Sequence, residues 1–229
     1  MQVFWGVFFS SGRRERDRIA LFIHSMNRIA IIDHGLCNLD SIKRATEECG
    51  AEPFITDRPQ ELAQAQRIIL PGVGAFPDAM RNLRERGLDA ALREHVMEKG
   101  VPLLGICLGM QLLATRGFEV EETEGLGFIP GEVRKLTLRP GERIPHIGWD
   151  EVTYPRESKL FAGIPEKKDF YFVHSFHLVP SDPADIIGAC ASAGGFAAAV
   201  QHKNIYATQF HPEKSQRVGF ALLRNFLSL

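Results

Sequence analysis

The stretch Pro102-Leu103-Leu104-Gly105-Ile106-Cys107-Leu108-Gly109-Met110-Gln111 decides the fold. Its pattern predicts a short buried strand, a sharp turn and the start of a helix. Gly105 and Gly109 remove side chains where the strand and the helix must approach closely, so Cys107 can occupy a strained elbow with its side chain directed outward. A thiol at a helix N-terminus faces unpaired N–H groups and the positive end of the helix dipole, and both favour the nucleophilic thiolate. The N–H of Leu108 is placed to stabilise an oxyanion.

A Gly-x-Cys-x-Gly pattern alone also fits a structural cysteine in a tight turn, so a base elsewhere in the chain must decide. The stretch Gln209–Ser215, which reads Gln-Phe-His-Pro-Glu-Lys-Ser, supplies one directly after the apolar run Ile205–Thr208. In an extended chain His211 and Glu213 project to the same side, so the imidazole can take the thiol proton while the carboxylate fixes its tautomer. Seven other histidines compete for this role, but none has a carboxylate two residues further on.

The cysteine and histidine motifs together resemble those of the class I (triad) glutamine amidotransferases. Three further stretches bring the chain closer to the glutaminase subunits of imidazole glycerol phosphate synthase. They are Pro71–Phe76 (Pro-Gly-Val-Gly-Ala-Phe), Pro145–Trp149 (Pro-His-Ile-Gly-Trp) and Tyr171–Phe176 (Tyr-Phe-Val-His-Ser-Phe). The resemblance runs from about Asn27 to the C-terminus and implies the fold of that class.

The resemblance implies hydrolysis of the side-chain amide of L-glutamine. Cys107 would attack the amide carbon, His211 would act as the base, and Glu213 would orient His211. The residues implied in substrate binding are Gly72, Val73, Gly74, Leu108, Gln111, His174, Ser175 and Phe176. The Val73 peptide would complete the oxyanion hole only after rotating between its flanking glycines, so we expect the isolated chain to be nearly inactive.

The same resemblance implies a partner, a cyclase subunit with a (β/α)₈ barrel that forms a heterodimer with this chain. Ammonia would pass internally to the cyclase and react with a phosphoribulosyl aminoimidazole carboxamide nucleotide, giving imidazole glycerol phosphate for histidine synthesis and an aminoimidazole nucleotide. Trp149 is the candidate for relaying docking to the Val73 loop. No metal or organic cofactor is expected, because the nucleophile is a side chain and Gly72-Val73-Gly74 lacks the spacing and the lysine of a phosphate-binding loop.

Two alternatives to this function remain open. The first is a glutaminase of another amidotransferase, such as that of pyridoxal phosphate synthase or of a purine-pathway enzyme. These would keep the cysteine and a comparable histidine but should lack the stretches Pro145–Trp149 and Tyr171–Phe176 as found here. The second is a catalytically silent partner-binding module, against which the intact triad argues. Labelling of Cys107 by a glutamine-mimicking electrophile would separate these classes.

Composition indicates one sizeable core and no affinity for polyanions. The chain has 229 residues, of which 45% are hydrophobic and 24% charged, and a formal net charge of −1, so nucleic acid is not expected as a partner. The four cysteines, Cys37, Cys49, Cys107 and Cys190, have neither metal-ligand spacing nor the density of a disulfide scaffold. This usage points to a reducing compartment, which for this protein is the cytoplasm.

Residues 1–25 differ from the rest of the chain. The apolar run Val3–Phe9 is far too short to span a bilayer and lacks the flanking features of a signal peptide, so no membrane association is expected. We interpret 1–25 as a non-native or disordered extension, and 26–229 as a single glutamine amidotransferase domain. Expression from Met26 should therefore give full activity.

From Met26 onward, short apolar runs alternate with helical segments, the pattern of an α/β domain with a mostly parallel central sheet flanked by helices. Strands are expected at Arg28–Ile32, Glu52–Thr56 and Arg67–Leu70, and helices at Asp40–Cys49 and twice within Asp78–Lys99. An additional antiparallel strand region follows in the C-terminal half. Its expected strands are Glu132–Leu136, Phe170–Val179, Ile186–Ala191, Phe196–Gln201 and Ile205–Phe210. A final helix, with Ser215 as its N-cap, closes the domain.

Overall fold

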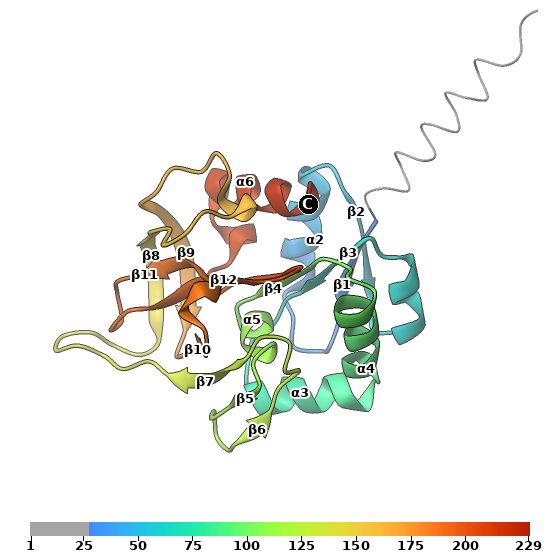
Figure 1. Ribbon diagram of the computed structural model, residues 1–229, viewed down its shortest axis with the longest axis horizontal. Coiled ribbons are helices and arrows are strands. Elements are labelled where there is room, and N and C mark those ends of the chain that lie inside the picture. Colours follow the sequence, from blue (N-terminus) through green and yellow to red (C-terminus); the bar gives the residue numbers. More distant parts are fainter. Residues whose placement is uncertain (1–27) are drawn as a thin grey trace, which may run out of the picture.

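A seven-stranded sheet forms the centre of the molecule, in the order β11-β12-β13-β4-β3-β1-β2 (Figure 1). The computed structural model describes residues 28–229, so the predicted extension 1–25 lies outside the described residues. The strands are β1 (Arg28–Ile32), β2 (Glu52–Thr56), β3 (Arg67–Leu70), β4 (Leu103–Ile106), β11 (Ile186–Cys190), β12 (Phe196–His202) and β13 (Ile205–Thr208). All pairs from β2 to β13 are parallel, and β12 and β11 extend the sheet through antiparallel pairs. The predicted α/β class with a mostly parallel sheet is confirmed.

Helices cover both faces of this sheet, as Figure 1 shows. The helices α2 (Leu39–Glu48) and α6 (Gln216–Leu227) pack together on one face. The other face carries α3 (Phe76–Glu85), α4 (Leu88–Leu92), which continues as a π-helical segment Arg93–Glu98, and α5 (Leu108–Leu112). None of the helices formed by residues 28–229 has the length and apolar character needed to cross a membrane.

The alternation of side chains along the strands divides the core into two parts. Ile29 and Ile31 of β1 belong to the part beneath α2 and α6, whereas Ala30 and Ile32 belong to the part that includes α3, α4 and α5. Each of these four residues is fully buried. Because both faces are covered, the central strands are apolar at consecutive positions, which is the sequence pattern of a buried parallel sheet.

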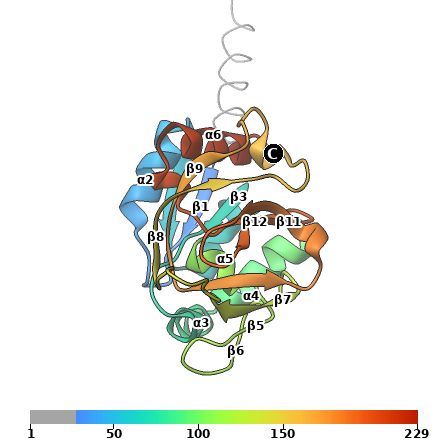
Figure 2. The ribbon, with the colours of Figure 1, turned by 90° about the vertical axis from the view of Figure 1, so that its left-hand side faces the viewer.

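Two smaller sheets stand beside the central one. A four-stranded sheet has the order β10-β7-β5-β6, and a two-stranded ribbon pairs β8 with β9. These strands are β5 (Arg116–Gly117), β6 (Thr123–Glu124), β7 (Gly131–Lys135), β8 (His146–Val152), β9 (Lys168–His174) and β10 (Phe176–Pro180). In Figure 2 the ribbon faces the viewer, and it leads through β9 and β10 into the four-stranded sheet.

The prediction of one strand over Phe170–Val179 was wrong. The chain forms two strands there, since β9 pairs with β8 while β10 pairs with β7, and Ser175 is the corner between them. Hydrophobic alternation continues through the corner because both strands bury one face, so the sequence pattern shows no break. The corner brings Ser175 to the edge of the site described below.

Ser215 occupies the predicted N-cap position, directly before α6. Its side chain does not cap the helix. Instead its buried hydroxyl donates to the carbonyl of His211 at 2.6 Å and accepts from the backbone N–H of Tyr171 at 3.0 Å. Ser215 therefore ties the segment around His211 to β9.

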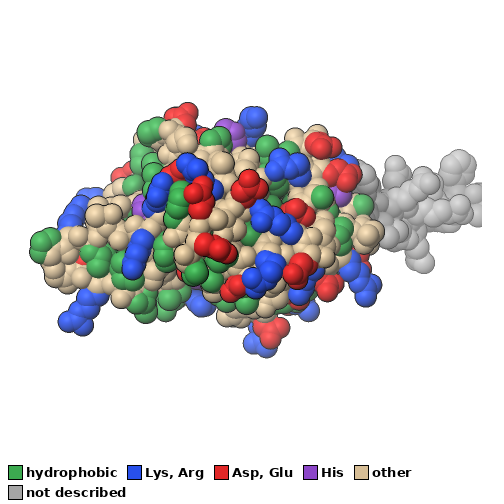
Figure 3. Space-filling model, turned by 90° about the horizontal axis from the view of Figure 1, so that it is seen from below, with side chains coloured by type: hydrophobic (Ala, Val, Ile, Leu, Met, Phe, Trp, Pro, Cys, Tyr) green, Lys and Arg blue, Asp and Glu red, His purple; other side chains and the backbone are tan. Residues whose placement is uncertain are grey.

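Figure 3 shows the molecule from the side of α3 and β6. Lys and Arg side chains are interspersed there with Asp and Glu side chains. Among the ion pairs of these elements are Arg81 with Asp78 on α3, and Arg116 of β5 with Glu122. Charges of both signs in alternation give this face no extended field of a single sign.

Candidate active site

Cys107 occupies the predicted elbow between β4 and α5. Its backbone has φ 54° and ψ −110°, a conformation that a non-glycine residue rarely adopts. The elbow is held in place by a hydrogen bond from the Cys107 N–H to the carbonyl of Thr208 on β13, at 2.8 Å. A side chain at Gly109 would place its Cβ 1.8 Å from the carbonyl oxygen of Leu70, and one at Gly105 would place it 2.9 Å from the carbonyl oxygen of Gly109. Both glycines are thus required by close backbone approach, as predicted.

The His211–Glu213 pair forms as predicted, but on a different backbone. Nδ1 of His211 lies 2.8 Å from Oε1 of Glu213. The intervening chain is not extended, because Pro212–Lys214 forms a single 3₁₀ turn. The turn brings the carboxylate back toward the ring, whereas a straight strand would keep the two side chains one pleat apart. The expectation of an extended His-Pro-Glu segment was therefore wrong, while the contact it was meant to explain is present.

The charge state of His211 is set by its neighbours. Burial lowers the pKa of the imidazole, but interactions with Cys107 and Glu213 outweigh burial and raise this pKa to about 10. Hydrogen bonding and charge at Cys107 and Glu213 both raise this pKa, and Nε2 of His211 is buried and is not taken by any other described residue. A raised imidazole pKa beside a thiol favours the thiolate–imidazolium pair, which is the reactive form of a cysteine nucleophile.

Cys107 and His211 meet in one pocket of about 290 Å³. Its walls are formed by Val73, Gly74, Cys107, Leu108, Gln111, Glu119, Pro145, Val173, His174, Ser175, Phe176 and His211. All of the predicted site residues are in this group except Gly72 and Glu213, which lie with His211 and Val73 on a much smaller neighbouring cavity. The structure thus assembles residues from six separate segments of the chain around one thiol.

The loop after β3 contributes Val73 to the pocket, but the N–H of Val73 does not serve as an oxyanion donor in this state. It donates to the carbonyl of Leu36 at 2.8 Å. The N–H of Leu108, as the first residue of α5, has no acceptor within its helix. Gly74 has φ 99°, which only glycine adopts without strain. One of the two predicted donors is therefore present and the second is turned away.

Gln111 and Gln209 link the thiol to the opposite wall. Nε2 of Gln111 donates to the carbonyl of Phe176 at 2.8 Å and to Oε1 of Gln209 at 3.2 Å. Nε2 of Gln209 in turn lies 3.7 Å from Sγ of Cys107. Gln209 was not among the predicted residues. Its position at the end of an apolar strand, directly before Phe-His-Pro-Glu, is the signal that would have identified it.

His174 and Phe176 close the corner at Ser175. Nδ1 of His174 lies 2.9 Å from the carbonyl oxygen of Phe176. Since a carbonyl only accepts, Nδ1 carries the proton. Burial lowers the pKa of His174 to about 3, so this ring is neutral at physiological pH. The corner presents backbone groups to the pocket and adds no positive charge there.

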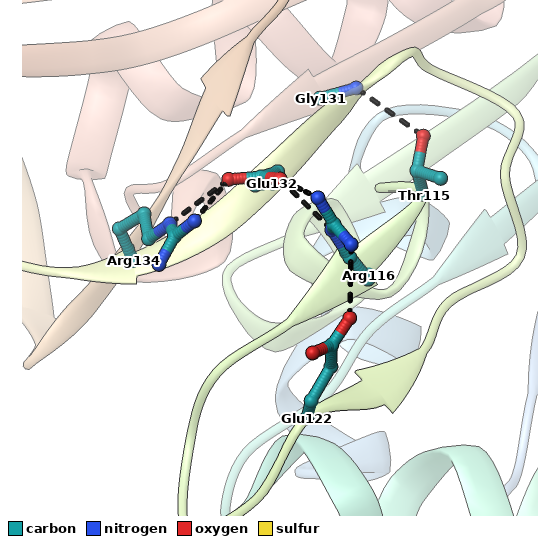
Figure 4. Close-up of polar contacts among 6 residues, drawn as sticks. All are labelled: Thr115, Arg116, Glu122, Gly131, Glu132 and Arg134. Carbon is teal, nitrogen blue, oxygen red and sulfur yellow. Dashed lines mark hydrogen bonds and ion pairs between the residues drawn. The ribbon is translucent and has the colours of Figure 1, made fainter.

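Glu119 is an acidic side chain on the pocket wall that was not predicted. Its Oε2 accepts from the N–H of Phe76 at the start of α3, at 2.8 Å. Arg116 precedes Glu119 and Glu122 follows it, and the two are bonded at 2.9 Å, while Arg116 also bonds to Glu132 of β7 at 2.6 Å (Figure 4). Four glutamates stand between positions 119 and 124, so spacing in the sequence could not distinguish Glu119 from the others.

The described residues contain no group of three or more His, Cys, Asp and Glu side chains arranged to hold a metal ion. The other thiols differ from Cys107 in their surroundings. Burial raises the pKa of Cys37 to about 12 and that of Cys190 to about 11. Both are packing residues with protonated thiols, and Cys107 is the thiol that lies at a helix start beside an imidazole.

Comparisons with known proteins agree with this geometry. The family described as "Glutamine amidotransferase class-I" matches residues 30–228. The "Imidazole glycerol phosphate synthase subunit HisH" of Moorella thermoacetica is 49% identical over 201 residues, which cover 88% of this chain and 94% of that protein. A "HisH 1" subunit of Campylobacter jejuni is 48% identical over 202 residues, covering 88% of this chain and 100% of that protein.

Solved structures of other amidotransferases share the fold. "PurLQS from Thermotoga maritima" superposes with a TM-score of 0.69 at 20% identity, covering 88% of this chain and 98% of that chain. A protein of Thermoplasma acidophilum assigned to GMP synthase gives a TM-score of 0.68 at 23% identity, covering 89% of this chain and 93% of that chain. At such identities the likeness extends to the fold alone, whereas the relatives above are nearly half identical over 88% of this chain. The chain belongs to the class-I glutamine amidotransferases and, within them, to the HisH subunits of imidazole glycerol phosphate synthase.

Proposed function

We propose that Cys107, His211 and Glu213 carry out the glutaminase reaction of this family. The observation that carries the proposal is the placement of Cys107 on a strained elbow in the same pocket as His211, whose other nitrogen is fixed by Glu213. The thiolate attacks the amide carbon of glutamine and forms a tetrahedral oxyanion. His211 then protonates the departing nitrogen, ammonia leaves, and a thioester to Cys107 remains. Water activated by the same imidazole cleaves the thioester and releases glutamate.

The oxyanion needs two donors, and the N–H of Leu108 is one of them. The second is the Val73 peptide, which donates to Leu36 in the present arrangement and must rotate before it can bind an oxyanion. Gly72 and Gly74 flank that peptide and permit the rotation. Loss of one such donor costs on the order of 10² to 10³ in rate, so the chain in this state is a poor glutaminase.

The amino-acid end of glutamine fits the wall opposite the thiol. The carboxylate of Glu119 complements the α-ammonium group of the substrate. The corner formed by His174, Ser175 and Phe176 offers backbone groups for the charged end. Gln111 lies between these features and the thiol, where its carboxamide adjoins the substrate side chain.

The exposed edge of β8 supports docking of a cyclase subunit with a (β/α)₈ barrel. Ile147 and Trp149 point outward there, with 59% and 46% of their surface exposed, and the Trp149 ring packs at 5.8 Å from that of Tyr171. Exposed apolar side chains of this size mark interaction surfaces. Ammonia would pass to the partner, which makes imidazole glycerol phosphate for histidine biosynthesis in the cytoplasm and releases an aminoimidazole nucleotide.

The proposal is tested by Cys107→Ala in the complex with the cyclase subunit. Synthesis that depends on glutamine should be abolished, while synthesis from added ammonium salt should continue at the wild-type rate. Loss of both activities would contradict a separate cyclase site. Retention of glutamine-dependent synthesis would rule out Cys107 as the nucleophile, and failure of wild-type Cys107 to react with a glutamine-mimicking electrophile in the complex would favour a silent binding module.

A further inference from the structure

A second histidine–carboxylate pair, partly buried, lies behind the pocket, and the proposed reaction does not use it. Nε2 of His146 lies 2.5 Å from Oδ2 of Asp150, and the hydroxyl of Ser192 donates to Oδ1 of Asp150 at 2.7 Å. Nδ1 of His146 lies 3.1 Å from Nε2 of His174. These contacts form a continuous chain of side chains that ends at the ring of His174, whose Nδ1 reaches the carbonyl oxygen of Phe176.

His146 and Asp150 both lie on β8, whose pairing with β9 is continuous. They are four residues apart, a separation of about 13 Å between Cα atoms in a straight strand. Gly148 stands between them with φ 149°, where an L side chain is strained, and the two side chains meet across it. The His146 ring is packed between those of Phe172 and Phe196, with centroids at 5.2 Å and 5.5 Å. Only 10% of the His146 side chain is exposed.

Counting donors and acceptors shows which atoms carry the protons in this series of hydrogen bonds. Nδ1 of His174 must donate to the Phe176 carbonyl, so Nε2 of this neutral ring is an acceptor. Nδ1 of His146 is therefore the donor to His174. The remaining nitrogen of His146 faces a carboxylate, which is also an acceptor once ionised, so a further proton lies between Nε2 of His146 and Asp150. Donation from Ser192 stabilises the ionised carboxylate and places that proton on His146.

The Phe176 carbonyl connects this series of hydrogen bonds to the wall of the proposed glutamine pocket. It accepts from both Nδ1 of His174 and Nε2 of Gln111. The orientation of the Gln111 carboxamide and the shape of the Ser175 corner are thereby fixed at a single acceptor. If His174 changed tautomer, its Nδ1 lone pair would face the carbonyl oxygen and the corner would have to open.

We propose that His146 and Asp150 are positioning residues for the glutamine pocket, holding His174 in the tautomer that fixes the Ser175 corner and the Gln111 carboxamide. The kinetic part of this inference rests on the proposed glutaminase function, whereas the assignment of the protons does not. Neither residue touches the substrate or Cys107, so their effect is on the binding of glutamine more than on its turnover. The pair acts through the donor that His146 presents to His174.

The kinetic test compares two substitutions of His146 in the full chain assembled with its cyclase partner. The side-chain amide of His146→Asn overlays Nδ1 and keeps the donor to His174, whereas that of His146→Gln overlays Nε2 and keeps the contact with Asp150. His146→Gln should raise the KM for glutamine about tenfold with kcat changed less than about threefold, and His146→Asn should remain within about threefold of wild type. Equal effects of both substitutions, or a wild-type KM for His146→Gln, would overturn the proposal.

The matched control is His202→Gln. His202 also pairs with an aspartate, Asp185, at 3.1 Å, but it lies at the far end of β12 and does not line the pocket. Its substitution should leave the KM for glutamine unchanged. An increase equal to that of His146→Gln would show that loss of any such pair has this effect, and would overturn the specific role.

The proton assignment is tested independently of activity by ¹⁵N NMR of the imidazoles in the wild-type chain. Both nitrogens of His146 should show protonated shifts at neutral pH, and His174 should be protonated at Nδ1 alone. In Asp150→Asn an amide can donate to Nε2, so His146 should become neutral while His174 keeps its tautomer. A neutral His146 or an Nε2-protonated His174 in the wild type would overturn the proposal even if both His146 variants failed to fold. A wild-type complex without glutaminase activity would instead overturn the proposed function and leave this assignment standing.

Discussion

The Nδ1 atom of His211 lies 2.8 Å from Oε1 of Glu213, and only 3% and 4% of the two side chains are exposed. The contact is shielded from solvent, so the carboxylate acts on the imidazole at close range and without screening by salt. The backbone of His211 is held as firmly as its ring, since its N–H donates to Tyr171 and its carbonyl accepts from Ser215. The base is thus oriented by three separate contacts, of which one is charged.

Glu213→Gln should lower kcat/KM for glutamine on the order of 10- to 100-fold, and less than His211→Ala does. The amide oxygen can still accept from Nδ1, but the negative charge that stabilises the imidazolium is lost. The pKa of His211 should fall for the same reason, and the pH dependence of Cys107 alkylation in the complex reports that change. Equal losses in the two variants would show that Glu213 does more than orient and stabilise the base.

Gly74→Ala should reduce activation of the glutaminase by the partner and its nucleotide ligand. An added Cβ meets no atom nearer than 3.7 Å, so the substitution acts through the φ of 99° and not through a clash. The Val73 peptide would then rotate less readily from its bond with Leu36. The measurement is the ratio of liganded to basal glutaminase rates, with cyclase binding as a check on assembly. Normal activation of Gly74→Ala, or an isolated wild-type chain as fast as the liganded complex, would contradict the peptide rotation.

Gly219→Ala should destabilise the fold by about 2 to 4 kcal/mol, although alanine is the better helix former. A Cβ on Gly219 would lie 1.9 Å from the carbonyl oxygen of Pro212. Helix α6 must then move away from the turn that follows His211, the proposed base. Urea unfolding measures the loss, with Gly50→Ala as the control, because Gly50 has φ 89° and open space around its Cβ. The Gly50→Ala control should lower the free energy of unfolding by about 1 kcal/mol. A stabilised Gly219→Ala would show that the close approach is absent.

Mild acid should destabilise the protein through His174. Its pKa is about 3 in the fold, compared with an ordinary value of 6.5, because burial opposes the charge. The unfolded chain therefore takes up this proton first, and the stabilisation present above pH 6.5 is lost as the pH falls toward 3. Between pH 6.5 and pH 5 the loss from this ring should be about 2 kcal/mol.

Two other histidines, His34 and His177, have pKa values lowered by burial and add a loss of the same sign. His211 has a raised pKa, so its contribution is constant below pH 6.5 and declines only as the pH rises toward 10. Urea unfolding at pH 6.5 and pH 5 should show a smaller acid loss in His174→Asn than in the wild type. Parallel losses in the two proteins would show that protonation of His174 is not the cause.

The parts of the molecule that depend on local sequence were predictable. The elbow at Cys107, the strands before it and the contact of His211 with Glu213 all follow from short motifs whose residues are close in the chain. The 3₁₀ turn at Pro212–Lys214 was not predicted, because the same contact is compatible with two backbone conformations. The break at Ser175 was hidden for a similar reason, since two half-buried strands in different sheets have the same alternation as one.

Contacts between distant segments were beyond the reach of sequence patterns. Glu119 reaches the pocket through a bond to Phe76, 43 residues earlier in the chain, and Gln209 reaches Cys107 across 102 residues. The hydroxyl of Ser215 was assigned to the helix that follows it, but it bonds to Tyr171 on a neighbouring strand. In each case a polar side chain had several suitable partners, and only the packing of the sheets selected one.

The proposed nucleophile and the proposed base are attached to neighbouring strands of the central sheet. Ile106 of β4 pairs with Thr208 of β13, and Cys107 and His211 follow those two positions. The separation between the strands is fixed by backbone hydrogen bonds, which substitutions other than proline leave in place. Variation within either hydrophobic core should therefore change how many molecules are folded, while each folded molecule keeps its catalytic efficiency. The surroundings of such a site can therefore change in sequence over evolutionary time while the site keeps its chemistry.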